Sequence, residues 1–113
     1  MYGPNGEFLT LSRNCYEMKH DKYEYKVCPF KEIHQQVFPQ PSTLIGQDPE
    51  WIKTGGNGQW VLRMNNGDSK QCPGAVKRQS LIIFECGLKD EVLSIQETEI
   101  CQYTIHFSTP AAC

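Results

Sequence analysis

The sequence has no long hydrophobic run and no excess of basic residues. No apolar stretch reaches the ~18–20 residues that a membrane-spanning helix requires, so we expect no membrane span. Eleven Lys and Arg residues stand against thirteen Asp and Glu residues, whereas a nucleic-acid-binding domain carries a basic face. We therefore expect neither a membrane nor a nucleic acid as a partner.

The motifs of several common reaction and metal sites are also missing. There is no G-x-S-x-G nucleophile elbow, and the glycine-rich segment 54–58 lacks the Lys-Ser/Thr that completes a phosphate-binding loop. No acidic cluster has the spacing of a calcium-binding loop. The three histidines, His20, His34 and His106, are far apart and lie among polar neighbours. We predict no metal site, no cofactor and no catalytic residue.

Cysteine, in contrast, is abundant, and no pair has the C-x-x-C spacing of a zinc site. The six cysteines are Cys15, Cys28, Cys72, Cys86, Cys101 and Cys113. An even number in a small domain is typical of a disulfide framework formed in an oxidising compartment. Six cysteines allow 15 connectivities, and spacing alone does not select one. The segment Met1–Pro4 is polar and does not resemble a signal peptide. Because disulfides form in the secretory route, we expect an excised domain or a mature fragment.

Alternation of polar and apolar residues predicts an all-β fold. Predicted strands are 8–11 (a short edge strand), 23–27, 59–64, 81–86 (a central strand), 92–95 and 101–107. No helical period of any length appears in the sequence. These patterns favour a small β-sandwich or a flattened barrel.

Two segments are predicted to be turns or loops. Asn65–Asp68 contains Asn-Gly, the strongest short hairpin signal, directly after the strand 59–64. The segment 39–58 is rich in Pro and Gly and predicts a long irregular loop, which would hold Trp51 outside the strands. A loop Trp can stack on a sugar ring or close the end of a small core, and both interpretations stay open.

Several motifs, taken in order, resemble a known family. They are Cys15-Tyr16-Glu17, Tyr23-Glu24-Tyr25, Cys28-Pro29-Phe30-Lys31, Gln35, Arg78-Gln79-Ser80, Cys86-Gly87, Glu97, Cys101, Tyr103 and Thr109-Pro110-Ala111-Ala112-Cys113. From Cys15 to Cys113 this order resembles a mannose 6-phosphate receptor homology (MRH) domain. The Cys-Pro-Phe-Lys and Thr-Pro-Ala-Ala-Cys segments are most similar to the glucosidase II β-subunit branch of that family.

Two other branches of the family are alternatives. The γ subunit of the lysosomal-enzyme phosphotransferase shares Cys-Pro-Phe and Arg-Gln-Ser with this chain. Lectins of endoplasmic-reticulum degradation carry a Trp-Trp pair where this chain has Lys22-Tyr23-Glu24-Tyr25, and the missing pair argues against that branch.

The resemblance implies a flattened β-barrel of two antiparallel sheets. It also implies three disulfides, Cys15–Cys28, Cys72–Cys101 and Cys86–Cys113. Residues 1–14 would then be an N-terminal extension with the edge strand, and residues 15–113 the lectin domain.

The resemblance further implies a mannose pocket built from Gln35, Arg78, Glu97 and Tyr103, with Trp51 at its side. Vicinal sugar hydroxyls both donate and accept hydrogen bonds. Arg78 offers donors, Glu97 accepts and Gln35 does both. Bonds to charged groups are the stronger ones. These residue types therefore suit a neutral hexose.

On this basis we expect a non-catalytic lectin domain of the endoplasmic reticulum lumen. It would bind terminal mannose of high-mannose N-glycans and bring glycoproteins to the catalytic α subunit of glucosidase II. Receptors of this family that bind phosphomannose place the residues of the phosphate site in the loop after the third cysteine. The corresponding segment here, Pro73–Lys77, is short, so the resemblance implies an unphosphorylated mannose. Two rival classes are a glycosidase that uses Glu97 and Glu99 as paired carboxylates and a disulfide-stabilised interaction module without a sugar site.

Overall fold

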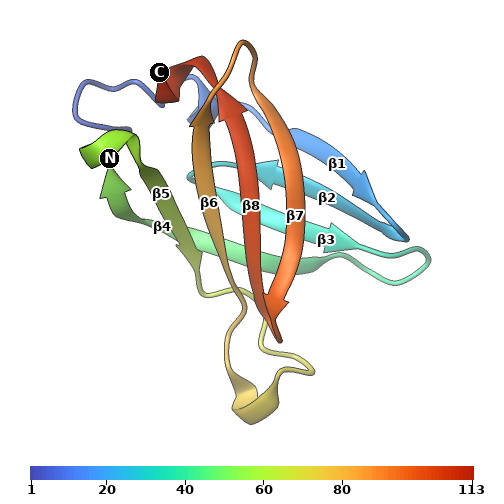
Figure 1. Ribbon diagram of the computed structural model, residues 1–113. Helices are drawn as coiled ribbons and strands as arrows, with labels where there is room; N and C mark the ends of the chain where they lie inside the picture. Colours follow the sequence, from blue (N-terminus) through green and yellow to red (C-terminus); the bar gives the residue numbers. More distant parts are fainter.

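Eight strands form one strongly curved sheet that nearly closes into a barrel (Figure 1). The computed structural model describes residues 1–113. The strands are β1 (Tyr16–His20), β2 (Tyr23–Cys28), β3 (Glu32–Gln36), β4 (Thr43–Thr54), β5 (Trp60–Asn65), β6 (Gln79–Cys86), β7 (Glu91–Glu99) and β8 (Gln102–Thr109). Four 3-10 turns complete the structure: η1 (Leu11–Arg13), η2 (Gly56–Gly58), η3 (Pro73–Ala75) and η4 (Pro110–Ala112). No helix here has the length and hydropathy needed to cross a membrane.

The strands lie in the order β1-β2-β3-β4-β5-β6-β8-β7. The long strand β4 belongs to both layers, because it pairs with β3 near its start and with β5 further along. Figure 1 shows β2 and β3 crossing behind β6, β8 and β7, with β1 next to β2. The all-β flattened barrel expected from the sequence is confirmed.

One pair of strands departs from the expected purely antiparallel pairing. Strands β6 and β8 are parallel, with Ser80 opposite Tyr103 and Phe84 opposite Phe107. The reason is topological: β7 returns along the outer edge, and β8 then inserts between β6 and β7. Every other pair of neighbouring strands is antiparallel.

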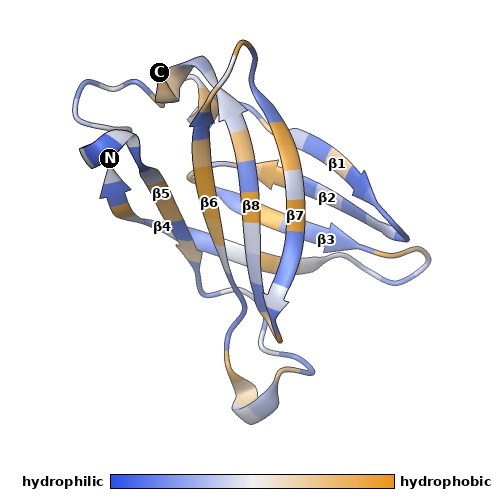
Figure 2. Cartoon of the chain, viewed as in Figure 1, coloured by the Kyte–Doolittle hydropathy of each residue, from blue (hydrophilic) through white to orange (hydrophobic).

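The core follows from the alternation of side chains along the strands. In β8, Tyr103, Ile105 and Phe107 are buried while the residues between them are partly exposed. Figure 2 shows hydrophobic and hydrophilic residues interleaved along β7 and β8, whereas the middle of β6 is continuously hydrophobic. Burying one such side chain stabilises the fold by about 1.5–3 kcal/mol. The strands predicted at 23–27, 59–64, 81–86, 92–95 and 101–107 are confirmed as β2, β5, β6, β7 and β8.

The edge strand predicted at 8–11 is wrong. This segment forms turns that lead into η1, and the amide of Ser12 donates to the carbonyl oxygen of Leu9 at 3.1 Å. Phe8 and Leu11 are both buried. Residues three apart point to opposite faces of a strand but to the same side of a 3-10 turn. The turn therefore places both side chains in the core.

The long irregular loop predicted at 39–58 is also wrong, because most of it is strand β4. Pro49 lies at a bulge, where the register with β5 shifts and Asp48 has a φ of 37°. A proline lacks the N–H of the strand ladder and is tolerated at such a position. The sequence analysis also missed β1 and β3, whose outward side chains are mostly charged or polar.

The Asn-Gly signal at 65–68 does not form a tight hairpin. The amide of Gly67 donates to the carbonyl oxygen of Arg78 at 2.8 Å. The amide of Arg78 donates to the carbonyl oxygen of Asp68 at 3.2 Å. The amide of Asp68 also bonds the carbonyl oxygen of Leu44 at 2.8 Å. These bonds extend the pairing beyond the ends of β5 and β6, so the chain reverses within 69–77 instead.

Three disulfides brace the barrel, and their pairing is the one implied by the family resemblance. Cys15–Cys28 joins the residue before β1 to the end of β2, and Cys86–Cys113 joins the end of β6 to the last residue. Cys72–Cys101 joins the 66–78 loop to the turn between β7 and β8. No cysteine is free.

Candidate functional site: a polar pocket

A polar pocket of about 370 Å³ lies at the end of the barrel where the β3–β4 connection, the 66–78 loop and the β7–β8 turn meet. In Figure 1 the 66–78 loop and the β7–β8 turn are at the lower end of the molecule. The lining residues are Tyr23, Gln35, Val37, Gln40, Pro41, Ser42, Thr43, Asp68, Lys70, Gln71, Arg78, Glu97 and Tyr103. Most of them are polar, unlike the core directly above.

Four of the five residues selected from the sequence come together in this pocket. Glu97 and Tyr103 lie opposite each other in the β7–β8 pair. Arg78 directly precedes β6, two residues before Ser80, which lies opposite Tyr103. Gln35 comes from β3, in the other layer. The barrel therefore joins residues that are up to 68 positions apart in the sequence (35 to 103).

Arg78 is held firmly by its surroundings. Its Nη1 donates to the carbonyl oxygens of Asp68 at 3.0 Å and Lys70 at 2.7 Å, and its Nε donates to the hydroxyl of Tyr103 at 3.3 Å. A guanidinium has five N–H donors. These bonds use three of them, which leaves both Nη2 donors open to a ligand.

Gln35 and Glu97 are each anchored through one atom. The Nε2 of Gln35 donates to the hydroxyl of Tyr25 at 3.0 Å, and the Oε2 of Glu97 accepts from the amide of Cys101 at 2.8 Å. No protein group bonds the Oε1 of either side chain. Each residue is thus oriented and keeps an acceptor free.

The two tyrosines next to these residues remain protonated at neutral pH. Burial raises the pKa of Tyr103 above its ordinary value of 10.0, the bond from Arg78 lowers it, and the charge of Glu97 raises it. Burial also raises the pKa of Tyr25, against the opposing bond from Gln35. Each hydroxyl accepts a bond from a neighbour, so its own proton can be donated.

The pocket therefore presents fixed donors and free acceptors to a small polar ligand. The charges of Arg78 and Glu97 balance each other, which suits a neutral molecule with several hydroxyl groups. No group of three or more His, Cys, Asp or Glu side chains is placed to hold a metal ion.

The paired carboxylates considered from the sequence are not gathered here. Glu97 lines the pocket, but Glu99 does not. The register of β7 shifts between them, so that Glu97 lies opposite Tyr103 and Glu99 opposite Gln102. The alternation that would have placed both on one face is broken by this bulge.

Trp51 does not line this pocket. Its ring packs among aromatic core residues, with centroids 5.3 Å from Phe8, 5.6 Å from Phe30 and 5.7 Å from Trp60. Its Nε1 donates to the carbonyl oxygen of Met1 at 2.6 Å. Of the two interpretations left open for Trp51, the structure supports the closing of the core.

The sequence analysis missed several residues of the pocket. Asp68 and Lys70 hold Arg78 through their backbone carbonyl oxygens, which no side-chain pattern reveals. Tyr23 alternates with Tyr25 and Val27 and looks like an ordinary strand residue. Ser42 and Thr43 fell inside the segment predicted as a loop. The only indication in the sequence that they lie near the pocket was that they follow Gln35 closely.

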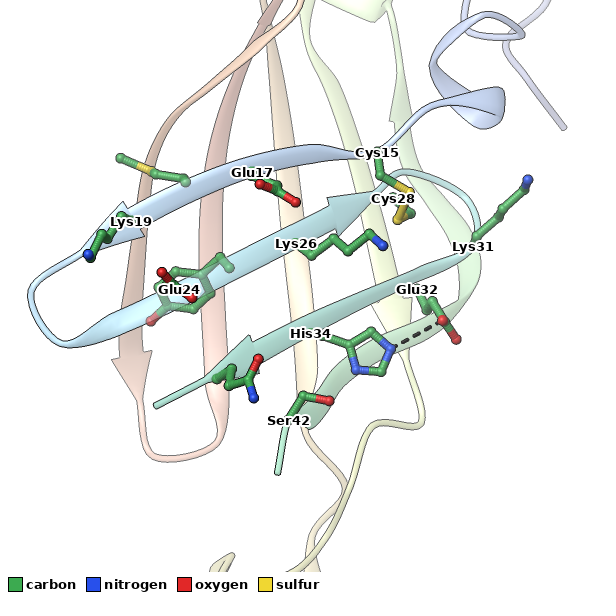
Figure 3. A pocket seen from close by; sticks show the side chains of 13 residues that line it. Cys15, Glu17, Lys19, Glu24, Lys26, Cys28, Lys31, Glu32, His34 and Ser42 are labelled. Carbon is green, nitrogen blue, oxygen red and sulfur yellow. Dashed lines mark ion pairs between the residues drawn. A yellow bond between two sulfur atoms is a disulfide. The ribbon is translucent and has the colours of Figure 1, made fainter. Parts of the chain in front are cut away.

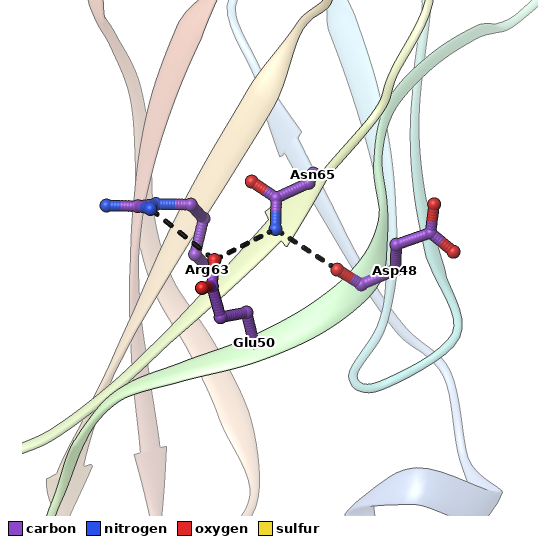
Figure 4. A network of polar contacts seen from close by, with 4 residues as sticks. All are labelled: Asp48, Glu50, Arg63 and Asn65. Atoms are coloured by element: carbon purple, nitrogen blue, oxygen red, sulfur yellow. Dashed lines mark hydrogen bonds and ion pairs between the residues drawn. The ribbon is translucent and has the colours of Figure 1, made fainter.

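Polar contacts on the outer side of β4 and β5 stabilise the bulge at Pro49 (Figure 4). The Nδ2 of Asn65 lies 3.2 Å from the carbonyl oxygen of Asp48 and 3.4 Å from the Oε1 of Glu50. Arg63 pairs with the same carboxylate oxygen at 3.4 Å. Asp48 and Glu50 are exposed and Arg63 and Asn65 are half-buried, and these groups bind one another rather than lining the pocket.

Solved structures with this architecture define the class. A crystal structure of the MRH domain of Glucosidase II beta bound to mannose matches with a TM-score of 0.69 and 27% identity, covering 93% of this chain and 98% of that one. The solution structure of the MRH domain of Yos9 complexed with alpha3,alpha6-Man5 shares the fold, with a TM-score of 0.70, 18% identity and coverage of 94% and 80%. This chain is an MRH domain.

The sequence places it more narrowly. A model of the family described as glucosidase II beta subunit-like protein matches residues 1–113, and the chain belongs to this family. Glucosidase 2 subunit beta of Homo sapiens is 33% identical over 113 residues, which cover 99% of this chain and 21% of the human protein. The protein of the same name in Oryza sativa subsp. indica is 35% identical over 112 residues, with coverage of 99% and 17%. The chain thus spans about a fifth of the length of these relatives.

Proposed function

We propose that the polar pocket binds a terminal, unphosphorylated mannose of high-mannose N-glycans. Gln35, Arg78, Glu97 and Tyr103 would make the hydrogen bonds to the ring hydroxyls. The observation that carries this proposal is their convergence in one pocket with Nη2 of Arg78 and Oε1 of Gln35 and Glu97 unpaired. A crystal structure of a 27% identical MRH domain, described as bound to mannose, supports the same ligand.

The domain would act as a lectin without a reaction of its own. Within a longer protein of the endoplasmic reticulum lumen, it would bring glycoproteins to the catalytic α subunit of glucosidase II. One monosaccharide in such a pocket typically binds in the millimolar range, about −4 kcal/mol. Tethering the substrate raises its effective concentration near the catalytic subunit, so weak binding is sufficient.

Replacing Arg78 tests the proposal. Arg78→Ala removes charge-assisted hydrogen bonds worth roughly 1.5–3 kcal/mol each, so mannose affinity should fall more than tenfold. The measurement is a titration with methyl α-mannoside followed by NMR, with a thermal melt to verify folding. Arg13→Ala is the matched control, because Arg13 is exposed in η1 and does not line the pocket.

A folded Arg78→Ala variant that binds mannose as well as the unmodified chain would remove Arg78 from the site. Arg78→Lys keeps the charge but loses the planar fork and should also bind weakly. Mannose 6-phosphate should bind no more tightly than mannose.

A further inference from the structure

The outer face of β1, β2 and β3 carries a groove of about 810 Å³, more than twice the volume of the polar pocket (Figure 3). Both volumes lie in the range of ligand sites, roughly 300–1,000 Å³. Three Glu and three Lys side chains line the groove together with His34, Gln36 and Ser42. Their charges cancel, so the groove as a whole suits a neutral polar ligand rather than an anion or a cation.

The groove adjoins the polar pocket. Ser42 lines both. The β3–β4 connection separates them: Val37 and Gln40 face the pocket, whereas Gln36, directly before Val37, faces the groove. A ligand that leaves the pocket past Ser42 therefore enters the groove.

Beside this path, one ring nitrogen of His34 has no hydrogen-bond partner and the ring of Phe38 is exposed. The Nε2 of His34 lies 3.2 Å from the Oε1 of Glu32, but its Nδ1 is buried and has no hydrogen-bond partner. In Figure 3 the His34 ring lies between Glu32 and Ser42, within the groove. Phe38, on the β3–β4 connection itself, is 68% exposed. A buried ring nitrogen without a hydrogen-bond partner costs free energy, and an exposed aromatic ring offers an apolar surface to a ligand.

We propose that this groove is a second carbohydrate subsite, which binds the sugars that follow the terminal mannose in the same oligomannose chain. The inference rests on the function proposed above. Sugar hydroxyls bond Ser42, the Lys and Glu heads and the exposed part of the His34 ring. The apolar face of one sugar covers the ring of Phe38. The occupant is the glycan because the terminal mannose is linked covalently to the next sugars, and these must lie beside the pocket.

The test compares one sugar with several, using the 113-residue chain. Methyl α-mannoside and a free high-mannose oligosaccharide are titrated into the unmodified chain and into His34→Ala and Phe38→Ala. A lost hydrogen bond or stacking contact of ordinary strength weakens binding about fivefold. Both variants should lose about that much affinity for the oligosaccharide and none for methyl α-mannoside. In the unmodified chain, the oligosaccharide should shift the amide resonances of Lys26 and His34, and the monosaccharide should not.

The controls are His20→Ala and Leu88→Ala. His20 is exposed at the end of β1 and Leu88 is fully exposed between β6 and β7, and neither lines the groove. Both should bind both ligands normally. The proposal is overturned if the test variants bind the oligosaccharide as tightly as the unmodified chain does. It is equally overturned if their affinities for the oligosaccharide and for methyl α-mannoside fall by the same factor. It is also overturned if a non-glycosylated peptide, and not the oligosaccharide, shifts the His34 resonance. If the unmodified chain binds no methyl α-mannoside, the proposed function itself fails.

Discussion

Gly67 shows how a residue without a side chain can determine the geometry of the pocket. A Cβ atom at this position would lie 2.8 Å from the carbonyl oxygens of both Arg78 and Leu44. Glycine allows three backbone segments to meet, and the amide of Gly67 then bonds the carbonyl oxygen of Arg78. The backbone that carries the guanidinium is therefore positioned by this contact.

Gly67→Ala should lower both stability and mannose affinity. The added methyl group meets backbone atoms that cannot rotate away, and overpacking of this kind costs about 1–3 kcal/mol. A thermal melt and a methyl α-mannoside titration measure the two effects. Gly56→Ala is the matched control, because no atom lies within 4 Å of its added Cβ. An unchanged melting temperature in Gly67→Ala would contradict this account.

At the scale of elements, the N-terminal segment belongs to the core rather than being an appendage. Phe8 is fully buried, and its ring lies 4.7 Å from Phe84 and 4.9 Å from Trp60 between centroids. Trp51 closes the same cluster and bonds the first residue of the chain. The first residues of the chain therefore pack against the barrel.

Phe8→Ala should destabilise the domain by about 3–5 kcal/mol, as expected for removing a buried aromatic ring. Chemical denaturation measures this free energy of unfolding. Leu9→Ala serves as the control, because Leu9 is 38% exposed and should cost little. If the segment were a mere extension, both variants would unfold at the same denaturant concentration.

For the whole molecule, the two ends of the barrel have different roles. One end is closed by aromatic rings, and the other is open and polar, with Cys72–Cys101 tying the 66–78 loop next to the pocket. Tyr103 lines the polar end and Tyr25 bonds Gln35 beside it, and burial raises the pKa of both phenols. Burial also raises the pKa of Tyr16 in β1.

Stability should therefore fall in alkaline solution. The folded pKa of each of these tyrosines exceeds the unfolded value of 10.0. The folded state keeps its phenolic protons where the unfolded state loses them. The contribution of these tyrosines to the free energy of unfolding is complete below about pH 10, and it is lost as the pH rises through the folded pKa. Melting temperatures measured across this range should decrease, and less steeply in Tyr103→Phe. An identical slope in that variant would exclude Tyr103 as a contributor.

The sequence by itself determined the strands whose alternation is strong, such as β8, and the chemistry of the pocket. The order of motifs, through its resemblance to an MRH domain, predicted the disulfide pairing and the candidate pocket residues Gln35, Arg78, Glu97 and Tyr103. Side-chain period and residue type are local properties, so they can be read before any contact is known. The same local reasoning failed where composition was misleading: Pro49 suggested a loop, and Asn66-Gly67 suggested a tight turn.

The tertiary structure alone decided which residues share a space. It placed Pro49 at a bulge within β4, inserted β8 beside β6, and packed Trp51 against the core rather than in the polar pocket. It also supplied the carbonyl oxygens that orient Arg78 and the groove that adjoins the pocket at Ser42. These features depend on backbone atoms and on contacts between distant segments, and neither leaves a periodic pattern in the sequence.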